Sequence, residues 1–222
     1  MFGGKAKVPL VVRTMTGAGL RAAAQHSPSL YGLTTAIPGL KTVVPSNARD
    51  AKGLLLAAIA DDDPVIFYEP KSLYFSPGDV PEERYTVPLG KAAIARSGKD
   101  ATIVAVGKMV ETSLTAAGRL AEEGIEVEIV DLRTLSPLDE ETILESLART
   151  GILVVVDEAP PRCGIASDVA AIAVDRGFDL LRGPIKRVTA PHTPVPFSPV
   201  LEDAYIPSPE RVIAAVHAAL ES

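Results

Sequence analysis

The sequence predicts an α/β fold with a mostly parallel sheet and helices on both faces of that sheet. Two observations carry this prediction. Short runs of β-branched and aliphatic residues alternate with longer segments in which apolar residues recur at helical spacing. Most of the strand-like runs are continuously apolar rather than alternating, which is typical of strands buried between two helical layers.

Composition excludes several classes of protein. Apolar residues make up 47% and charged residues 23% of the 222 residues, which is ordinary for a globular protein. The net charge of −6 argues against nucleic-acid binding, which needs a basic face. No apolar run approaches the roughly 20 residues that span a bilayer, and the first residues lack the pattern of a signal peptide. The single cysteine, Cys163, suits a reducing compartment. We therefore expect a cytoplasmic protein with neither nucleic-acid nor membrane partners.

The first part of the chain reads as strand, helix and strand. Strands are expected at residues 8–14, 41–44 and 65–68, and a helix begins after a cap at Ser46 or Asn47. The apolar positions of this helix are Ala51, Leu54, Leu55, Ala58 and Ile59. A strand–helix–strand unit implies parallel pairing through a right-handed crossover.

An acidic turn follows that helix. Asp61, Asp62 and Asp63 lie where the helix ends, and a helix C-terminus carries unpaired carbonyls and partial negative charge. Three carboxylates are unfavourable there unless solvent or a cation compensates them. Carbonyl and carboxylate oxygens suit a hard cation, such as a structural monovalent ion. A solvated acidic turn is the alternative.

A proline-rich segment separates two parts of the chain. We expect residues 1–75 to form one α/β unit, residues 76–90 a linker that wraps on a surface, and residues 91–222 a complete α/β domain. In the second part, strands are expected at 92–96, 102–106, 127–130, 153–156 and 185–188, and helices at 110–123, 139–150, 164–176 and 209–220. Gly124, Gly151 and Ser208 mark helix ends. The first unit has too few elements to cover its own sheet, so either the chain is truncated or a partner supplies the missing layer.

Several side chains are candidates for chemistry. His26 lies in a loop with small neighbours, where an imidazole can act as general acid or base, although a structural role is the alternative. Glu158 follows a buried strand at the end where open sheets bind ligands, and a turn-forming role is equally open. Asp131 and Arg133 follow another strand at the equivalent edge of the sheet and are further candidates for binding a ligand. An ion pair between the two residues is the alternative. Three residues are interpreted as structural, surface or docking residues: Cys163, His192 and His217.

Ordered motifs along almost the whole chain then point to a family. They are Arg13 with Gly17, QHS (25–27), PGLK (38–41), DAKGL (50–54), DDDP (61–64), EPK (69–71), VPLGK (87–91), DLRTL (131–135), PLD (137–139), TPVPF (193–197) and LED (201–203). With these motifs the chain resembles the β subunit of the thiamine-diphosphate-dependent E1 component of 2-oxo acid dehydrogenase complexes. The acetoin and pyruvate dehydrogenase β subunits are the most similar members, and residues 13–31 favour acetoin.

The resemblance implies a partial transketolase-like pyrimidine-binding domain followed by a transketolase C-terminal domain. It implies thiamine diphosphate as cofactor, with Mg²⁺ and the diphosphate held by an α subunit in an α2β2 assembly that includes a β–β contact. A lipoyl-bearing E2 is the expected acceptor of the acyl group. His26 matches the family's active-site histidine. The potassium-binding loop of some relatives matches Asp61 and Asp63, with the backbone of Leu10, Ala58 and Ile59.

The sequence departs from the family in two places. Family chains begin well before Met1, and that earlier part carries the Glu that activates the cofactor. The chain as given is therefore expected to be incomplete and inactive on its own, and no cofactor-binding residue is assigned here. The usual HSQS reads HSPS at 26–29, and the second His often found before PGLK is absent. These departures leave the substrate open among acetoin, pyruvate and a branched-chain 2-oxo acid. They also leave an alternative function, in which a non-catalytic fragment binds the α subunit or E2.

Overall fold

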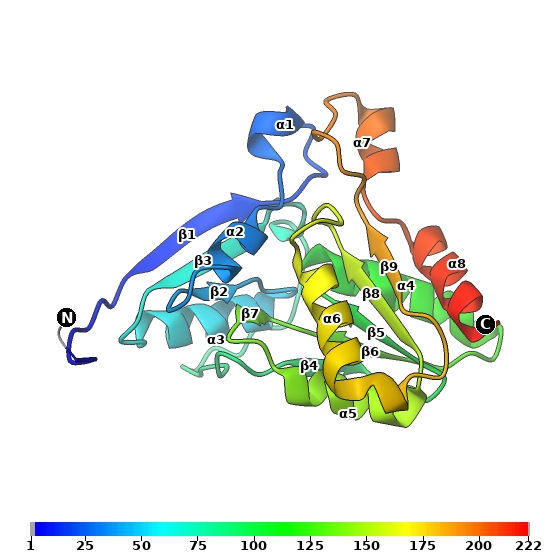
Figure 1. Ribbon diagram of the computed structural model, residues 1–222. Coiled ribbons are helices and arrows are strands. Elements are labelled where there is room, and N and C mark those ends of the chain that lie inside the picture. Colours follow the sequence, from blue (N-terminus) through cyan, green and yellow to red (C-terminus); the bar gives the residue numbers. More distant parts are fainter. Residues whose placement is uncertain (1–2, 222) are drawn as a thin grey trace.

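The computed structural model describes residues 3–221, which form two α/β units side by side (Figure 1). The first unit contains a four-stranded sheet in the order β1-β3-β2-β7, and the second a five-stranded sheet in the order β4-β6-β5-β8-β9. The strands are β1 (Val11–Thr16), β2 (Lys41–Val43), β3 (Val65–Pro70), β4 (Ala93–Arg96), β5 (Ala101–Ala105), β6 (Val127–Asp131), β7 (Thr134–Ser136), β8 (Leu153–Asp157) and β9 (Lys186–Thr189). The α-helices are α1 (Ala23–His26), α2 (Tyr31–Thr35), α3 (Ala48–Ile59), α4 (Lys108–Glu122), α5 (Glu140–Thr150), α6 (Ile165–Gly177), α7 (Pro199–Tyr205) and α8 (Pro209–Leu220).

In the first sheet, β3 lies between β1 and β2 and pairs with both in parallel, as the strand–helix–strand pattern predicts. Helix α3 covers one face, because its apolar stripe packs on the inward side chains of β2 and β3. That cluster contains Val43, Leu54, Ala58, Val65 and Phe67. Asn47 caps the helix by accepting a hydrogen bond of 2.8 Å from the amide of Asp50. Helix α2 lies on the opposite face, where the rings of Tyr31 and Tyr68 pack edge to face.

Strand β7 joins the two units. It lies in the second part of the sequence, yet it pairs antiparallel with β2, with Val43 opposite Thr134. No strand is expected there from the sequence, because three residues are too few to show a period and their pairing depends on the contact with the first unit. The carbonyl of Arg133 accepts a hydrogen bond of 2.8 Å from the amide of Val44 and extends this contact. The second unit therefore contributes one strand to the first sheet.

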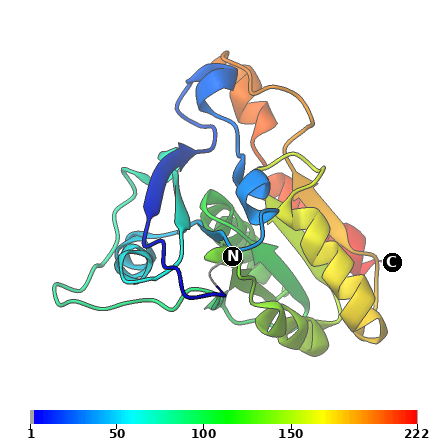
Figure 2. The same ribbon diagram turned by 60° about the vertical axis from the view of Figure 1, so that its left-hand side comes forward.

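In the second sheet, β5, β6, β8 and β9 are parallel and β4 is an antiparallel edge strand. Helices α4 and α8 cover one face, and helices α5 and α6 cover the other, which confirms the mostly parallel, two-sided architecture (Figure 2). Alternate residues of β5 serve the two layers, since Ile103 packs with α4 and α8 whereas Val104 packs with α5 and α6. Gly151 ends α5 in a left-handed conformation, and Ser208 caps α8, both as expected.

Three short helices differ from the sequence expectations. The sequence places His26 in a loop and indicates no helix at α1, α2 or α7, because four to seven residues cannot establish a helical period. Their conformation is instead set by tertiary contacts. Helices α1 and α7 lie side by side in both views, at the top of the molecule (Figures 1 and 2).

Residues 76–90 run over the outer surface of α3. The hydroxyl of Tyr85 donates to the carbonyl of Arg49 at 2.7 Å, and the amide of Val87 donates to the carbonyl of Gly53 at 3.1 Å. A Cβ added at Gly53 would lie 2.6 Å from a methyl of Val87 and 2.8 Å from the ring of Tyr85. The glycine therefore allows this segment to lie directly on the helix.

Strand β1 forms the outer edge of the first sheet. Large apolar side chains remain exposed on it and at the end of α3, including Val12, Met15 and Ile59. An edge strand with exposed apolar residues is a surface that another chain or segment can cover.

Candidate functional site

His26 is exposed and ends the short helix α1, which stands on a loop beside α7 (Figures 1 and 2). The loop is anchored from below by Lys71, which follows β3 and is only 4% exposed. The ammonium of Lys71 donates a hydrogen bond to the backbone carbonyl of His26 and lies 3.5 Å from the hydroxyl of Ser27. Burial lowers the pKa of Lys71, and the carboxylates of Glu202 and Glu158 oppose that shift only in part. The histidine, whose side chain can transfer protons, thus lies on a segment whose backbone is held by Lys71.

The second unit holds the beginning of the same loop. Glu202 of α7 accepts hydrogen bonds from the amides of Gly19 at 2.9 Å and Arg21 at 3.0 Å, and from the Arg21 guanidinium at 2.8 Å. Glu158 accepts a hydrogen bond from the amide of Ala18. Gly17 has φ of +89°, and a Cβ there would lie 3.1 Å from both carboxylate oxygens of Glu158. Glycine at position 17 therefore accommodates both the positive φ and the close approach of Glu158.

Glu158 follows Asp157 at the carboxyl end of β8. Burial raises the pKa of Glu158 to about 7, although the hydrogen bond from Ala18 and the charge of Lys71 favour the ionised form. Asp157 accepts a hydrogen bond from the hydroxyl of Tyr31, and burial raises the pKa of both groups. The carboxyl end of β8 thus contacts the chain on both sides of His26, at Ala18 and at Tyr31.

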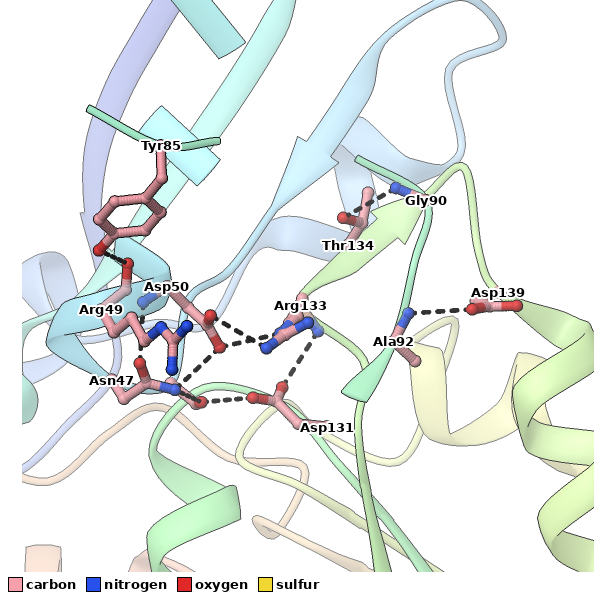
Figure 3. Close-up of polar contacts among 11 residues, drawn as sticks. Asn47, Arg49, Asp50, Tyr85, Gly90, Ala92, Asp131, Arg133, Thr134 and Asp139 are labelled. Carbon is pink, nitrogen blue, oxygen red and sulfur yellow. Dashed lines mark hydrogen bonds and ion pairs between the residues drawn. The ribbon is translucent and has the colours of Figure 1, made fainter. Parts of the chain in front are cut away.

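A second polar cluster joins the two units through Asp131 and Arg133 (Figure 3). The guanidinium of Arg133 makes two hydrogen bonds, of 2.8 and 3.0 Å, to the carboxylate of Asp50 on α3. The expected alternative, an ion pair between Arg133 and Asp131, is wrong, because only the backbone amide of Arg133 donates to Asp131, at 3.1 Å. Ser46 also donates to Asp131, whose pKa is raised to about 6 by burial. A groove of about 890 Å³ lies along this cluster, with Arg13 and Glu69 among the residues on its wall.

A lysine of the same chain, Lys41, supplies a cation at the acidic turn. The ammonium of Lys41 lies 2.6 and 2.7 Å from the two oxygens of Asp61 and 3.3 Å from Asp63. Burial raises the pKa of Asp61, but hydrogen bonds from Lys41 and from the amide of Asp63 outweigh burial, so the net shift is downward. Of the other residues expected to hold potassium, the carbonyl of Leu10 accepts from Val65 at 2.8 Å and that of Ala58 accepts from Asp61 at 3.3 Å. Ile59 lies at the end of α3 and is exposed.

The remaining candidates lie on the surface. Cys163 is exposed, His192 lies in an exposed turn, and His217 contacts Glu123 at 2.8 Å on the outside of α8. Between residues 3 and 221, no group of three or more His, Cys, Asp and Glu side chains is arranged to hold a metal ion. Within the same part of the chain, no helix has the length and apolar character needed to cross a membrane.

Three residues of these clusters were not expected from the sequence: Lys41, Lys71 and Glu202. Lys71 and Glu202 belong to the EPK and LED motifs, which match the family but did not indicate what these two residues do. Their contacts join residues 45 and 183 positions apart, which no local pattern reveals.

Comparisons with known proteins agree with the fold. Residues 1–77 match the family described as the transketolase pyrimidine-binding domain, and residues 90–212 match the transketolase C-terminal domain. A solved structure described as a split-gene transketolase, inactive β4 tetramer, superimposes with a TM-score of 0.80 at 27% identity, over 97% of this chain and 67% of that one. The chain therefore belongs to the transketolase-like class.

Two curated relatives narrow this class. The chain is 65% identical over 96% of its length to the acetoin:2,6-dichlorophenolindophenol oxidoreductase subunit β of Bacillus subtilis, and spans 63% of that relative. It is 45% identical over 99% of its length to the pyruvate dehydrogenase E1 component subunit β of the same organism, and spans 67% of it. The chain belongs to the family of these E1 β subunits.

Proposed function

We propose that the chain acts as the β subunit of a thiamine-diphosphate-dependent enzyme that cleaves acetoin or decarboxylates a 2-oxo acid. The acyl fragment would pass to a lipoyl group on an E2 protein. The observation that carries the proposal is the 65% identity to an acetoin oxidoreductase β subunit over 96% of the chain. Acetoin is the favoured substrate, because identity falls to 45% with the pyruvate and 42% with the 2-oxoisovalerate relatives.

In this proposal His26 gives or takes a proton at the substrate or at the incoming lipoyl sulfur. An imidazole suits that task because it changes protonation near neutral pH. His26 is exposed, and the backbone of its loop is bonded to both units, so it can meet a substrate without losing its position. Thiamine diphosphate, when bound, supplies the carbon nucleophile.

We assign the diphosphate and its Mg²⁺ to an α subunit in an α2β2 assembly with a β–β contact. The exposed apolar edge at Val12 and Met15 supports coverage by another chain. The exposed, unpaired thiol of Cys163 fits a cytoplasmic enzyme. A potassium ion at the acidic turn fits less well than the sequence indicates, because the ammonium of Lys41 already pairs with both Asp61 and Asp63. If potassium binds at this turn, the Tm of the protein should be higher in potassium chloride than in sodium chloride of equal ionic strength.

One observation supports a second candidate, a binding module without turnover. The solved relative at 27% identity is described as an inactive β4 tetramer, so a related chain assembles without activity. In that case the chain would bind the α subunit or E2 but not convert substrate.

Reconstitution separates the two candidates. The chain, completed with the part of the Bacillus subtilis relative that it does not span, is produced together with the α subunit of the acetoin enzyme. The complex is supplied with thiamine diphosphate and Mg²⁺ and assayed for substrate-dependent reduction of 2,6-dichlorophenolindophenol. We expect reduction with acetoin to exceed reduction with pyruvate or 2-oxoisovalerate. Formation of the complex with no reduction by any of the three, while a full-length relative is active in parallel, would favour the binding module.

A further inference from the structure

We propose that two buried carboxylates of the second unit and one buried ammonium of the first position the loop that carries His26. These positioning residues are Glu158, Glu202 and Lys71. The inference rests on the proposed function only where it treats His26 as the reactive group. The anchoring itself follows from the contacts.

Glu202 is the strongest anchor. Its side chain is fully buried and accepts from three donors, all in residues 19–21 of the loop, at 2.8 to 3.0 Å. A buried carboxylate is stable only while its partners stay in place. Movement of the loop away from α7 would leave this charge buried without its donors, so Glu202 opposes such movement.

Lys71 and Glu158 hold the loop at other points. Lys71 donates to the carbonyl of His26 itself, at the end of α1. Glu158 accepts from the amide of Ala18, next to Gly17, whose missing side chain leaves room for the carboxylate. The anchors lie on both sides of α1, and their bonds to residues 18 and 26 go to backbone atoms. They therefore fix the path of the loop and leave the imidazole available for chemistry.

The environment of Glu158 makes the anchoring depend on pH. The groups that face its carboxylate are Asp157, Lys71, Glu202, Tyr31 and Tyr205. Release of the loop would expose Glu158 to water, which favours the ionised carboxylate. Rising pH should therefore favour release, with Glu158 as the group responsible.

Hydrogen exchange measured by mass spectrometry tests the anchoring without any activity. Protection of residues 17–27, corrected for the intrinsic exchange rate, is compared with protection of β5. Glu202→Gln and Lys71→Met should each reduce protection in the loop roughly tenfold, as expected for loss of hydrogen bonds to a charged group, and leave β5 unchanged. Glu158→Gln should remove the loss of loop protection between pH 6 and 8. The control, Glu210→Gln, alters an exposed ion pair with Arg119 and should change neither segment.

If the hydrogen-exchange protection of residues 17–27 stays within twofold of the parental value in both Glu202→Gln and Lys71→Met, the proposal is overturned. If a variant loosens β5 as well, Arg21→Gln decides, because it removes the partly exposed guanidinium that joins the loop to α7 through Glu202, Asp203 and the carbonyl of Pro199, and leaves the buried carboxylate in place. Unchanged loop protection in that variant would also overturn it.

The assembled enzyme supplies the functional test. Glu202→Gln should lower kcat at least tenfold with little change in KM, because the reactive group is misplaced rather than the substrate lost. Normal kcat in a variant with a loosened loop would contradict the positioning role. An inactive parent complex with the expected exchange pattern would instead contradict the proposed function and leave the anchoring in place.

Discussion

At the scale of single residues, the buried charges of the described chain each meet a specific partner. Glu202 accepts from loop amides and a guanidinium, Lys71 donates to a loop carbonyl, and Asp50 binds Arg133. Charges removed from water are costly unless paired in this way. Substitutions that remove one partner should therefore cost more than substitutions at the surface.

The acidic turn offers a matched pair of variants. Lys41→Met removes the partly buried partner of Asp61 and should lower the free energy of unfolding by about 1 kcal/mol at pH 7. Because the pKa of Asp61 is lowered in the folded state, this contribution is present above its ordinary value of 3.8 and is lost as pH falls through the lowered value. Urea unfolding at pH 7 and in stronger acid measures the change.

Lys7→Met is the control for this turn, because Lys7 pairs with the neighbouring Asp62 where both side chains are exposed. It should produce no measurable change in stability. Equal effects of the two substitutions would show that Lys41 is not the compensating cation.

Glu158 predicts how stability depends on pH. Its pKa rises from 4.5 to about 7 on folding, so its contribution to stability is present below 4.5 and is lost as pH rises through about 7. The free energy of unfolding of Glu158→Gln, relative to that of the parent, should therefore rise by up to about 3 kcal/mol between pH 4.5 and 8. Asp131 titrates in both proteins and cancels in the difference. Parallel stability curves for the variant and the parent would contradict this assignment, and exposed Glu145→Gln serves as the control.

At the scale of elements, local patterns predicted the long helices and buried strands closely. Residues 209–220 form α8 as expected, and the strand and helix positions of the second unit agree within about two residues. The segments that were missed, α1, α2, α7 and β7, have three to seven residues and are held by contacts with distant parts of the chain. The sequence could not reveal them, because their conformation depends on tertiary contacts rather than on a local period.

The contact between α3 and residues 76–90 can be tested with two glycines in helices. Gly53→Ala should gain helix propensity but force Val87 and Tyr85 away, a net cost of about 1 kcal/mol. Gly118→Ala in α4 meets nothing within 4 Å and should stabilise by up to ~1 kcal/mol. Tryptic cleavage at exposed Arg84 should accelerate only in Gly53→Ala. Similar cleavage rates in both variants would mean that the segment does not depend on Gly53.

At the scale of the whole molecule, the two units are joined by β7, by the Asp50–Arg133 pair and by the anchored loop. The candidate site lies across this junction. Its histidine was singled out by its match to the family's active-site histidine, and the acid at the end of β8 by its position after a buried strand. Their connection was not predicted, since the contact between Ala18 and Glu158 spans 140 positions.

A double-mutant cycle tests the coupling of the units. Asp50→Asn and Arg133→Gln should each cost roughly 3 kcal/mol, because each leaves a mostly buried charge without its partner. The double variant should cost less than the sum by 1–3 kcal/mol, as expected for residues in contact. Denaturant unfolding followed by circular dichroism supplies the values. Additive costs would show that the pair does not couple the units.

The most direct measurement is the rate of acetoin-dependent dye reduction by the completed chain assembled with its α subunit, with His26→Ala compared to His217→Ala. His217 is the control because it contacts Glu123 on the outer face of α8. Loss of one positioned acid or base should slow turnover by about 10²-fold or more in His26→Ala, while His217→Ala retains the parental rate. A parental rate in His26→Ala, in an intact complex, would contradict the claim that both units hold this loop to place its histidine for catalysis.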